Sequence, residues 1–524
     1  MFKNQPKGLF ALALANTGER FGYYTMLAIF TLFMQAKFGW DEAVAGQVNA
    51  IFLAVVYFAP LFGGMLADKI GYGRCVVAGF IVMFLGYLGL AIPTEPDTAG
   101  KVAMFAGLAA VSLGTGLFKG NLQVLIGNLY DDPKYSSRRD AAFSLFYMAI
   151  NIGAMFAPSM ARWITNQHLA QYGFEYTADA VATYGDKAPQ YLEALYGGYG
   201  LCFGVACVSL ILSAGIYFAC RSWFKHADVT AAKAKETANA APVEELTAKQ
   251  TKDRIVALLL VFAVVIFFWM AFHQNGSALT FFAKKYTNLT IEGGMRFGFN
   301  IFSLALLAFS VYTGFGFFQS ENAKNKVMCA IATLAAWTGA YFLYAGMADP
   351  TAAQPSDFQQ FNPFFVVALT PFSMAFFGAF EKKGKEISAP ARIAWGMLVA
   401  ALGFGVITMA STSLISPMDL GEGTQSILSP SWLISTYFTL TIAELLLSPM
   451  GISFVSKVAP PKYKGMMMGG WFVATAIGNY LSSIPSMLWN KIPLMYNWAI
   501  LIALCLISAV VMFALLKKLK QMTA

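Results

Sequence analysis

The chain has 524 residues, of which 58% are hydrophobic and 12% are charged, and its formal net charge is +9. Soluble domains carry about 25% charged residues, so this composition excludes an ordinary soluble protein. In a membrane protein the surplus Lys and Arg usually mark cytoplasmic loops, and we expect no nucleic-acid partner.

Apolar runs recur from one end of the chain to the other, and about 20 helical residues suffice to cross the hydrocarbon core of a bilayer. The first run is too long for the apolar part of a cleavable signal, so we expect it to remain as a helix. The sequence predicts an all-α polytopic membrane protein with fourteen spans, near 8–36, 43–66, 73–93, 101–128, 141–166, 197–222, 253–282, 297–319, 325–347, 361–381, 389–411, 431–456, 464–489 and 494–517.

Charge fixes the direction of these spans, because cytoplasmic loops are enriched in Lys and Arg. The loops 348–360 and 412–429 contain no Lys or Arg and are predicted outside, while 277–296 is a basic exception, interpreted as a helix extension at the headgroups. We expect a protein of the cytoplasmic (inner) membrane with both termini in the cytoplasm. The cytoplasmic set is Lys69, Arg74, Lys134, Arg138, Arg139, Lys324, Lys326, Lys382, Lys383, Lys385, Lys457, Lys462 and Lys464.

A polar linker rich in Ala, Lys, Glu and Thr divides the spans into six and eight. Two six-helix halves are a common transporter plan, so the additional pair is predicted to be an insertion. The expected organisation is a first bundle over 1–222, a cytoplasmic linker over 223–252, a second bundle over 253–517 and a tail over 518–524. The insertion, near 297–347, has few polar residues and is interpreted as a lipid-facing hairpin with no transport role.

Five ionisable residues lie deep in apolar spans: Glu19, Arg20, Lys119, His273 and Glu444. Such a residue costs roughly 2.5–3.5 kcal/mol on insertion scales, and it usually faces a protein interior or a water-filled cavity. With the insertion set aside, the spans of Glu19 and His273 occupy matching places in the two halves, as do those of Lys119 and Glu444. The pattern favours a site between the halves with a cation at one end and an anion at the other. The simpler interpretation, in which these charges only join helices, stays open.

The first span carries a polar stripe beside Glu19. Residues spaced three and four apart share one helix face, and tyrosines there offer phenol donors and flat apolar walls. The stripe consists of Asn16, Arg20, Tyr23, Tyr24 and Leu27.

These residues carry a resemblance to a known family. GERFGYYT resembles the motif E-x-x-E-R-F-x-Y-Y-G in helix 1 of the proton-dependent oligopeptide transporters, within the major facilitator superfamily. Other segments agree in order and spacing: GGMLADKIGYGR, LFKGN, FSLFYMAINIGA, ELLLSPMGISFVSKVAP and GGWFVATAIGN. The resemblance covers most of both halves and implies the major facilitator fold, two six-helix bundles plus the extra helix pair.

The resemblance also implies roles for single residues. Lys119 would meet the carboxylate of a bound peptide, and Glu444 with Asn151 and Asn362 would hold its ammonium group. Glu19 would be a proton-carrying carboxylate with Arg20 as its ionic partner. The resemblance implies side-chain pockets lined by Tyr23, Tyr24, Tyr57, Trp269 and Trp471, and gating by Asp68 and Arg74.

The chain departs from the family motif at several points. Asn16 stands for the first motif Glu, Thr25 for the Gly and Leu27 for a frequent Arg, while His273 replaces a Glu of helix 7. Because imidazole titrates near neutral pH, we expect His273 to share the proton-linked work with Glu19, Arg20 and Lys119.

Three functions follow as expectations. The favoured one is a proton-coupled symporter that imports di- and tripeptides by alternating access, as a monomer and with no cofactor besides protons. The alternative is a transporter of the same fold for another small solute, such as nitrate, an amino acid or a peptidomimetic, with weak or no proton coupling. A membrane-embedded enzyme or sensor is disfavoured, because there is no nucleophile–base pair, phosphate loop or metal cluster among the three histidines and six cysteines.

Overall fold

The computed structural model describes residues 5–523 except 41, 178–179, 231–245, 277, 354, 386, 418, 420–426 and 490, so the middle of the predicted linker lies outside the described residues. Most of the described backbone is helical, as a chain surrounded by lipid must satisfy its backbone hydrogen bonds within each segment. A single short antiparallel ribbon joins β1 (Thr290–Ile291) to β2 (Thr351–Ala352) in the described part, with Thr290 opposite Ala352.

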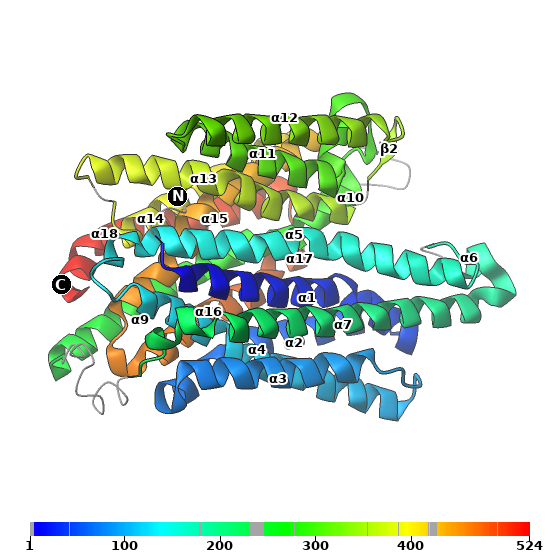
Figure 1. Cartoon of the computed structure of the whole chain (residues 1–524). Coiled ribbons are helices and arrows are strands. Elements are labelled where there is room, and N and C mark those ends of the chain that lie inside the picture. The colour runs from blue at the N-terminus through cyan, green and yellow to red at the C-terminus, as the bar shows by residue number, and fades with distance from the viewer. Residues whose placement is uncertain are drawn as a thin grey trace.

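The first half of the chain forms a six-helix bundle (Figure 1). Within it α1 packs on α5 and α7, and α4 packs on α2 and α3. The bundle consists of α1 (Lys7–Phe38), α2 (Glu42–Ile70), α3 (Tyr72–Ala91), α4 (Thr98–Leu129), α5 (Arg139–Gln171) and α7 (Ala188–Ala219), with the short α6 (Ala180–Tyr184) before α7.

The second half forms a matching bundle, in which α14 packs on α15 and α18, and α9 packs on α16 and α18. The two bundles meet chiefly where α2 packs on α16 and where α5 packs on α13 and α15. The second bundle consists of α9 (Ala248–Phe272), α13 (Phe361–Lys382), α14 (Ala389–Ser411), α15 (Pro430–Val458), α16 (Lys464–Leu481) and α18 (Leu494–Thr523), with the short α10 (Ala278–Tyr286) and α17 (Ser483–Leu488).

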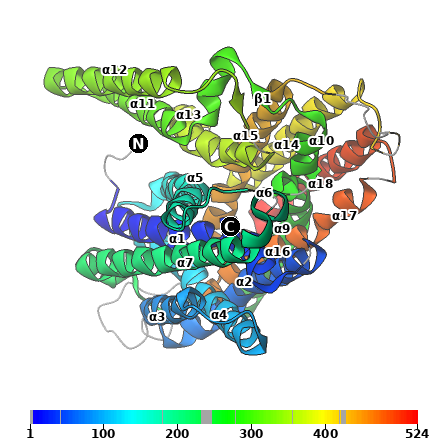
Figure 2. The ribbon, with the colours of Figure 1, turned by 90° about the vertical axis from the view of Figure 1, so that its right-hand side faces the viewer.

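The remaining helix pair, α11 (Ile301–Gln319) and α12 (Ala323–Ala345), lies outside both bundles at the upper edge of Figure 2. The helix α11 packs on α12 and α13, while α12 packs mainly on α11, so most of its apolar surface stays uncovered. Buried Arg296 holds one end of the pair by donating to the carbonyl oxygens of Met347 and Ala348, each at 3.0 Å. The predicted hairpin is therefore present, and its lack of a transport role stays a prediction.

Twelve described helices are long and apolar enough to cross a membrane. Two more predicted spans, α1 and α16, are also helical but less apolar, because they carry polar residues of the interior. The predicted continuous span near 253–282 is wrong in detail, since α9 ends at Phe272 and α10 begins at Ala278. Gln274 donates to the carbonyls of Met270 (2.9 Å) and Ser482 (3.0 Å), which takes up acceptors of the last helical turn.

Glycines allow the two bundles to approach closely along α2 and α16. A Cβ atom on Gly64 would lie 2.0 Å from the carbonyl oxygen of Gly465, and one on Gly469 would lie 2.4 Å from the Cα atom of Leu61. Small residues at helix crossings let backbones meet in membrane proteins. The crossing fixes the position of α16 along the first bundle. It therefore also determines which residues of α16 face the interior.

The helix α1 begins and the helix α18 ends at the same end of the molecule, toward the left of Figure 1. We call this the terminal end and the opposite one the far end. The arrangement agrees with the predicted even number of spans, which places both termini on one side.

The remaining helical segments of the described chain are short 3₁₀ helices: η1 (Ser136–Arg138), η2 (Gly185–Lys187), η3 (Arg221–Trp223), η4 (Lys225–Ala227), η5 (His273–Gly276), η6 (Gly293–Phe299), η7 (Pro355–Gln360) and η8 (Pro461–Tyr463).

Candidate functional site

Glu19 and Arg20 form a buried ion pair in the middle of α1, with exposed fractions of 0% and 2%. Neighbours on a helix point apart, yet the long guanidinium arm folds back so that Nε and Nη2 each donate to a Glu19 oxygen at 2.5 Å. The guanidinium carbon also lies 4.5 Å from the ring centre of Tyr23. Both carboxylate oxygens of Glu19 therefore accept hydrogen bonds from Arg20 on the same helix.

Lys119 of α4 has no such partner. Its ammonium lies 4.0 Å from the ring centre of Tyr57 and 4.5 Å from that of Phe472. Among the described residues no carboxylate lies within ion-pair distance of it, although it interacts electrostatically with Glu19 and Arg20. The side chain is partly exposed, and its ammonium group lies between aromatic rings of the two bundles.

Glu444 of α15 provides the opposite charge and is 3% exposed. One oxygen accepts a short hydrogen bond from the Tyr147 hydroxyl of α5, and the other accepts from the Asn362 amide at 2.6 Å. Asn362 also donates to Thr441 (3.1 Å), and Asn151 donates to the Tyr147 carbonyl one turn away (3.0 Å). Both hydrogen-bond partners of the Glu444 carboxyl group are neutral, and no described cation forms an ion pair with it.

The aromatic residues predicted to line pockets fall into two groups. Tyr24 and Tyr57 are partly exposed, whereas Tyr23, Trp269 and Trp471 are buried. Trp471 packs so tightly on α15 that a Cβ on Gly451 would lie 1.9 Å from its ring. Trp471 therefore acts as a rigid wall in this conformation rather than as part of an open surface.

His273 lies at the end of α9, where its Nδ1 is 3.2 Å from the carbonyl oxygen of Trp269. The imidazole is 5.0 Å from the ring centre of Trp269 and interacts electrostatically with Lys119. Tyr24 in turn interacts with both Arg20 and Glu444. His273 is thus in the electrostatic neighbourhood of Lys119, and Tyr24 is in that of both Arg20 and Glu444.

The arrangement offers a fixed cation from the first bundle and a fixed anion from the second. A small zwitterion between them would neutralise both charges, which no described protein group does directly. The described residues contain no group of three or more His, Cys, Asp or Glu able to hold a metal ion. The chemistry that these groups support is binding of oppositely charged ends of one molecule.

Asp68, predicted to gate, lies where α2 meets the start of α16. Its carboxylate accepts from the backbone N–H groups of Gly465 (2.8 Å) and Met466 (3.0 Å), and from the Tyr72 hydroxyl (2.7 Å). A carboxylate at a helix N-terminus satisfies free N–H groups and favours the helix dipole. Arg74 is exposed and makes no hydrogen bond or ion pair among the described residues, so of the two predicted gating residues only Asp68 contacts the second bundle.

Removing the charge of Asp68 should loosen this contact between the bundles. We expect Asp68→Asn to slow transport several-fold while substrate affinity in equilibrium binding stays within about twofold, because the residue biases a conformation and lies apart from the charged ends. Binding and uptake measured on the same preparation check this. A large loss of affinity with normal turnover would contradict it.

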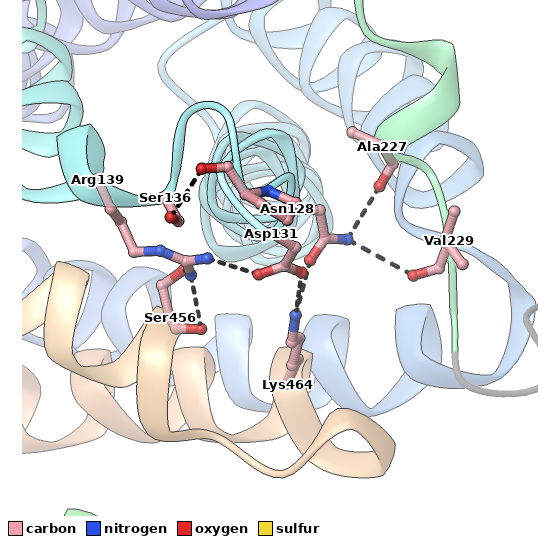
Figure 3. Close-up of polar contacts among 9 residues, drawn as sticks. Asn128, Asp131, Ser136, Arg139, Ala227, Val229, Ser456 and Lys464 are labelled. Carbon is pink, nitrogen blue, oxygen red and sulfur yellow. Dashed lines mark hydrogen bonds and ion pairs between the residues drawn. The ribbon is translucent and has the colours of Figure 1, made fainter. Parts of the chain in front are cut away.

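A second contact joins the bundles at the terminal end (Figure 3). Lys464 of α16 donates to Asp131 at 2.7 Å and to Asn128 at 3.1 Å. Arg139 donates to Asp131 at 2.5 Å and to the Ser456 hydroxyl of α15 at 3.0 Å. Together with those of Asp68 these bonds join the two bundles at the terminal end, and we call this joined arrangement closed. At the far end α1 and α9 are not among the described helix pairs that pack extensively.

Asp131 makes this contact dependent on pH. Burial would raise the pKa of the Asp131 carboxyl, but Lys464 and Arg139 outweigh burial and hold that pKa below its ordinary value. A lowered pKa means that ionised Asp131 stabilises the closed terminal end above the ordinary pKa. The stabilisation is lost as the pH falls through the lowered value.

Asp131→Asn should therefore shift the population toward an open terminal end at neutral pH, by about two- to fivefold because the Asp131 side chain is half exposed. The distance between spin labels at exposed Ser137 and Lys457 measures this shift. Asp132→Asn removes the same charge one residue away and serves as the control. An unchanged distance distribution in Asp131→Asn would contradict the role of this pair.

Sequence reasoning missed several of these partners. Tyr147 lies in the FSLFYMAINIGA motif, one turn before Asn151, and that spacing could have indicated it. Nothing local in the sequence indicated Phe472 or the pair of Asp131 and Lys464, because each contact joins segments more than 300 residues apart.

Comparisons with known proteins bear on the family and the fold of the chain. The sequence profile of the POT family matches residues 73–243 and 332–501, more than half of the chain. Dipeptide and tripeptide permease B of Xenorhabdus bovienii is 27% identical over 503 residues, with 92% of this chain and 86% of the permease covered. Dipeptide and tripeptide permease A of Escherichia coli is 25% identical over 501 residues, with 92% and 84% covered. A solved peptide transporter POT in complex with sulfate shares the fold, with a TM-score of 0.61, 23% identity and coverage of 100% and 97%.

Proposed function

The chain belongs to the POT family, and on this premise we propose that it is a proton-coupled symporter that imports di- and tripeptides. Both of these relatives are named dipeptide and tripeptide permeases, and the chain spans most of their length. It is a multi-pass integral membrane transporter and not an enzyme.

The observation that carries the proposal is the pair of uncompensated charges in opposite bundles. Lys119 is held only by aromatic rings, and Glu444 only by neutral donors. A peptide brings a carboxylate and an ammonium group at its two ends, whatever its side chains are. Fixing the two ends would give specificity for short peptides while partly exposed Tyr24 and Tyr57 leave room for varied side chains.

The closed terminal end supports alternating access. We propose that this end faces the cytoplasm of the inner membrane, since its loops are rich in Lys and Arg. The substrate would then enter from the far end, and breaking the contacts of Asp68 and Asp131 would release it inside. Both charged ends of the site come from one chain, so we propose that a monomer is sufficient for transport.

Protons are the proposed coupling ion, with no other cofactor. Glu19 is the candidate carrier, because protonation would free Arg20, and His273 beside Lys119 is the second candidate.

One observation favours the alternative of weak or absent coupling to protons. Asn16 stands where the family motif has a carboxylate, and its buried amide has no partner among the described residues.

Counterflow in liposomes tests the function. We expect labelled dipeptide uptake to be driven by unlabelled di- and tripeptides but not by free amino acids or nitrate, which do not have the charged ends of a peptide. An imposed pH gradient should then drive net accumulation. Competition by free amino acids, or accumulation that ignores the gradient, would favour the alternative transporter.

A further inference from the structure

Lys119 is held by a ring from each bundle. Tyr57 belongs to α2 of its own bundle, whereas Phe472 belongs to α16 of the other. The distances of 4.0 and 4.5 Å to the ring centres are within the range of about 6 Å at which a cation is attracted to an aromatic face. The Lys119 ammonium, which is predicted to meet the substrate carboxylate, is therefore contacted by a residue of the other bundle.

Phe472 is a rigid support. It is 4% exposed, and the crossing of α2 and α16 at Gly64 and Gly469 fixes the helix that carries it. A Cβ atom added to Gly120 would lie 3.8 Å from the Cε2 atom of Phe472, so the ring lies close beside α4. The ring cannot leave Lys119 without movement of α16 against the first bundle.

An aromatic face has a different effect from a carboxylate partner. A carboxylate would neutralise the ammonium and compete with the carboxylate of a substrate, whereas a ring attracts the cation and leaves its charge in place. The carboxylate of Glu19, which interacts electrostatically with Lys119, already accepts two hydrogen bonds from Arg20. Lysine has a flexible four-carbon stem, so without the ring its charge would spread over many positions.

We infer that Phe472 is a positioning residue, which holds the Lys119 ammonium toward the place of the substrate carboxylate. The inference rests on the proposed function. It predicts that loss of the ring weakens binding only of ligands that carry a free carboxylate. A residue that merely fills space would affect all ligands of the same size alike.

The test is equilibrium binding of dialanine and of its C-terminal amide to the purified full-length protein. We expect Phe472→Leu to weaken dialanine binding by about 3- to 10-fold and to leave binding of the amide unchanged. Phe472→Tyr keeps an aromatic face and should bind both ligands like the wild type. Phe404→Leu, at a fully buried site of the same bundle away from any cation, is the control for lost packing and should not change the ratio of the two affinities.

If the leucine variant does not fold, Phe472→Met, which keeps most of the volume and removes the ring, gives the same comparison. Equal weakening of both ligands, or weakening of neither, would overturn the inference. Failure of the proposed function looks different. In that case the wild-type protein itself would not prefer dialanine over its amide.

Discussion

Lys119→Ala and Glu444→Ala are each expected to reduce dipeptide uptake by at least about 100-fold while the protein stays folded. In each variant one charged end of the peptide would enter the interior without a partner. Truncating one member of a buried charge pair costs about 3–5 kcal/mol, and each 1.4 kcal/mol corresponds to a factor of ten. The fold should survive, because Lys119 makes no ion pair and Glu444 accepts from only two neutral groups among the described residues.

Uptake in liposomes reconstituted with each variant measures this effect, and thermal unfolding of the same preparations reports the fold. Lys457→Ala and Glu292→Ala remove the same charges at exposed positions and are the matched controls. Dipeptide uptake near the wild-type level in either Lys119→Ala or Glu444→Ala would show that the charged end in question has been assigned to the wrong residue.

Glu19→Gln is expected to abolish uptake driven by a pH gradient and to preserve counterflow. Glutamine cannot carry a proton, but it can still accept a hydrogen bond from Arg20, so the geometry of the pair should largely persist. Exchange of labelled for unlabelled peptide needs no net proton movement. The two assays therefore separate coupling from binding.

His273→Gln tests whether His273 takes part in proton coupling together with Glu19. If the imidazole titrates during the cycle, the pH optimum of uptake should move, because imidazole changes charge near neutral pH. An unchanged pH profile would make His273 a pocket residue only and leave Glu19 as the single carrier. Loss of counterflow together with gradient-driven uptake in Glu19→Gln would mean that the pair is needed for binding and not for coupling.

The helices were predictable because hydropathy is a local property. The runs that became α2, α3 and α4 are apolar over the length of a bilayer whatever they pack against, and their predicted bounds agree with the structure within a few residues. The break after Phe272 was not predictable in this way. It depends on Gln274 reaching the carbonyl of Ser482, which lies 208 residues further along the chain.

The charges of the site were predictable for a related reason. A lone Lys119 or Glu444 in an apolar run is costly in lipid and is therefore expected in the interior. The spacing of Tyr147 from Asn151 could have indicated that Tyr147 faces the interior, but which charge Tyr147 or Phe472 contacts was not predictable, because each lies in the opposite bundle from its partner. Such pairs depend on the register of one bundle against the other, which close contacts such as Gly64 on Gly465 determine.

Equilibrium binding of end-capped peptides tests the central claim most directly, namely that Lys119 and Glu444 hold opposite ends of one peptide. The wild-type protein should bind both an amidated and an N-acetylated dipeptide at least about tenfold more weakly than the free dipeptide. Lys119→Gln should lose only the discrimination against the amide, and Glu444→Gln only the discrimination against the acetylated peptide. Wild-type protein that binds all three peptides equally well would contradict the claim.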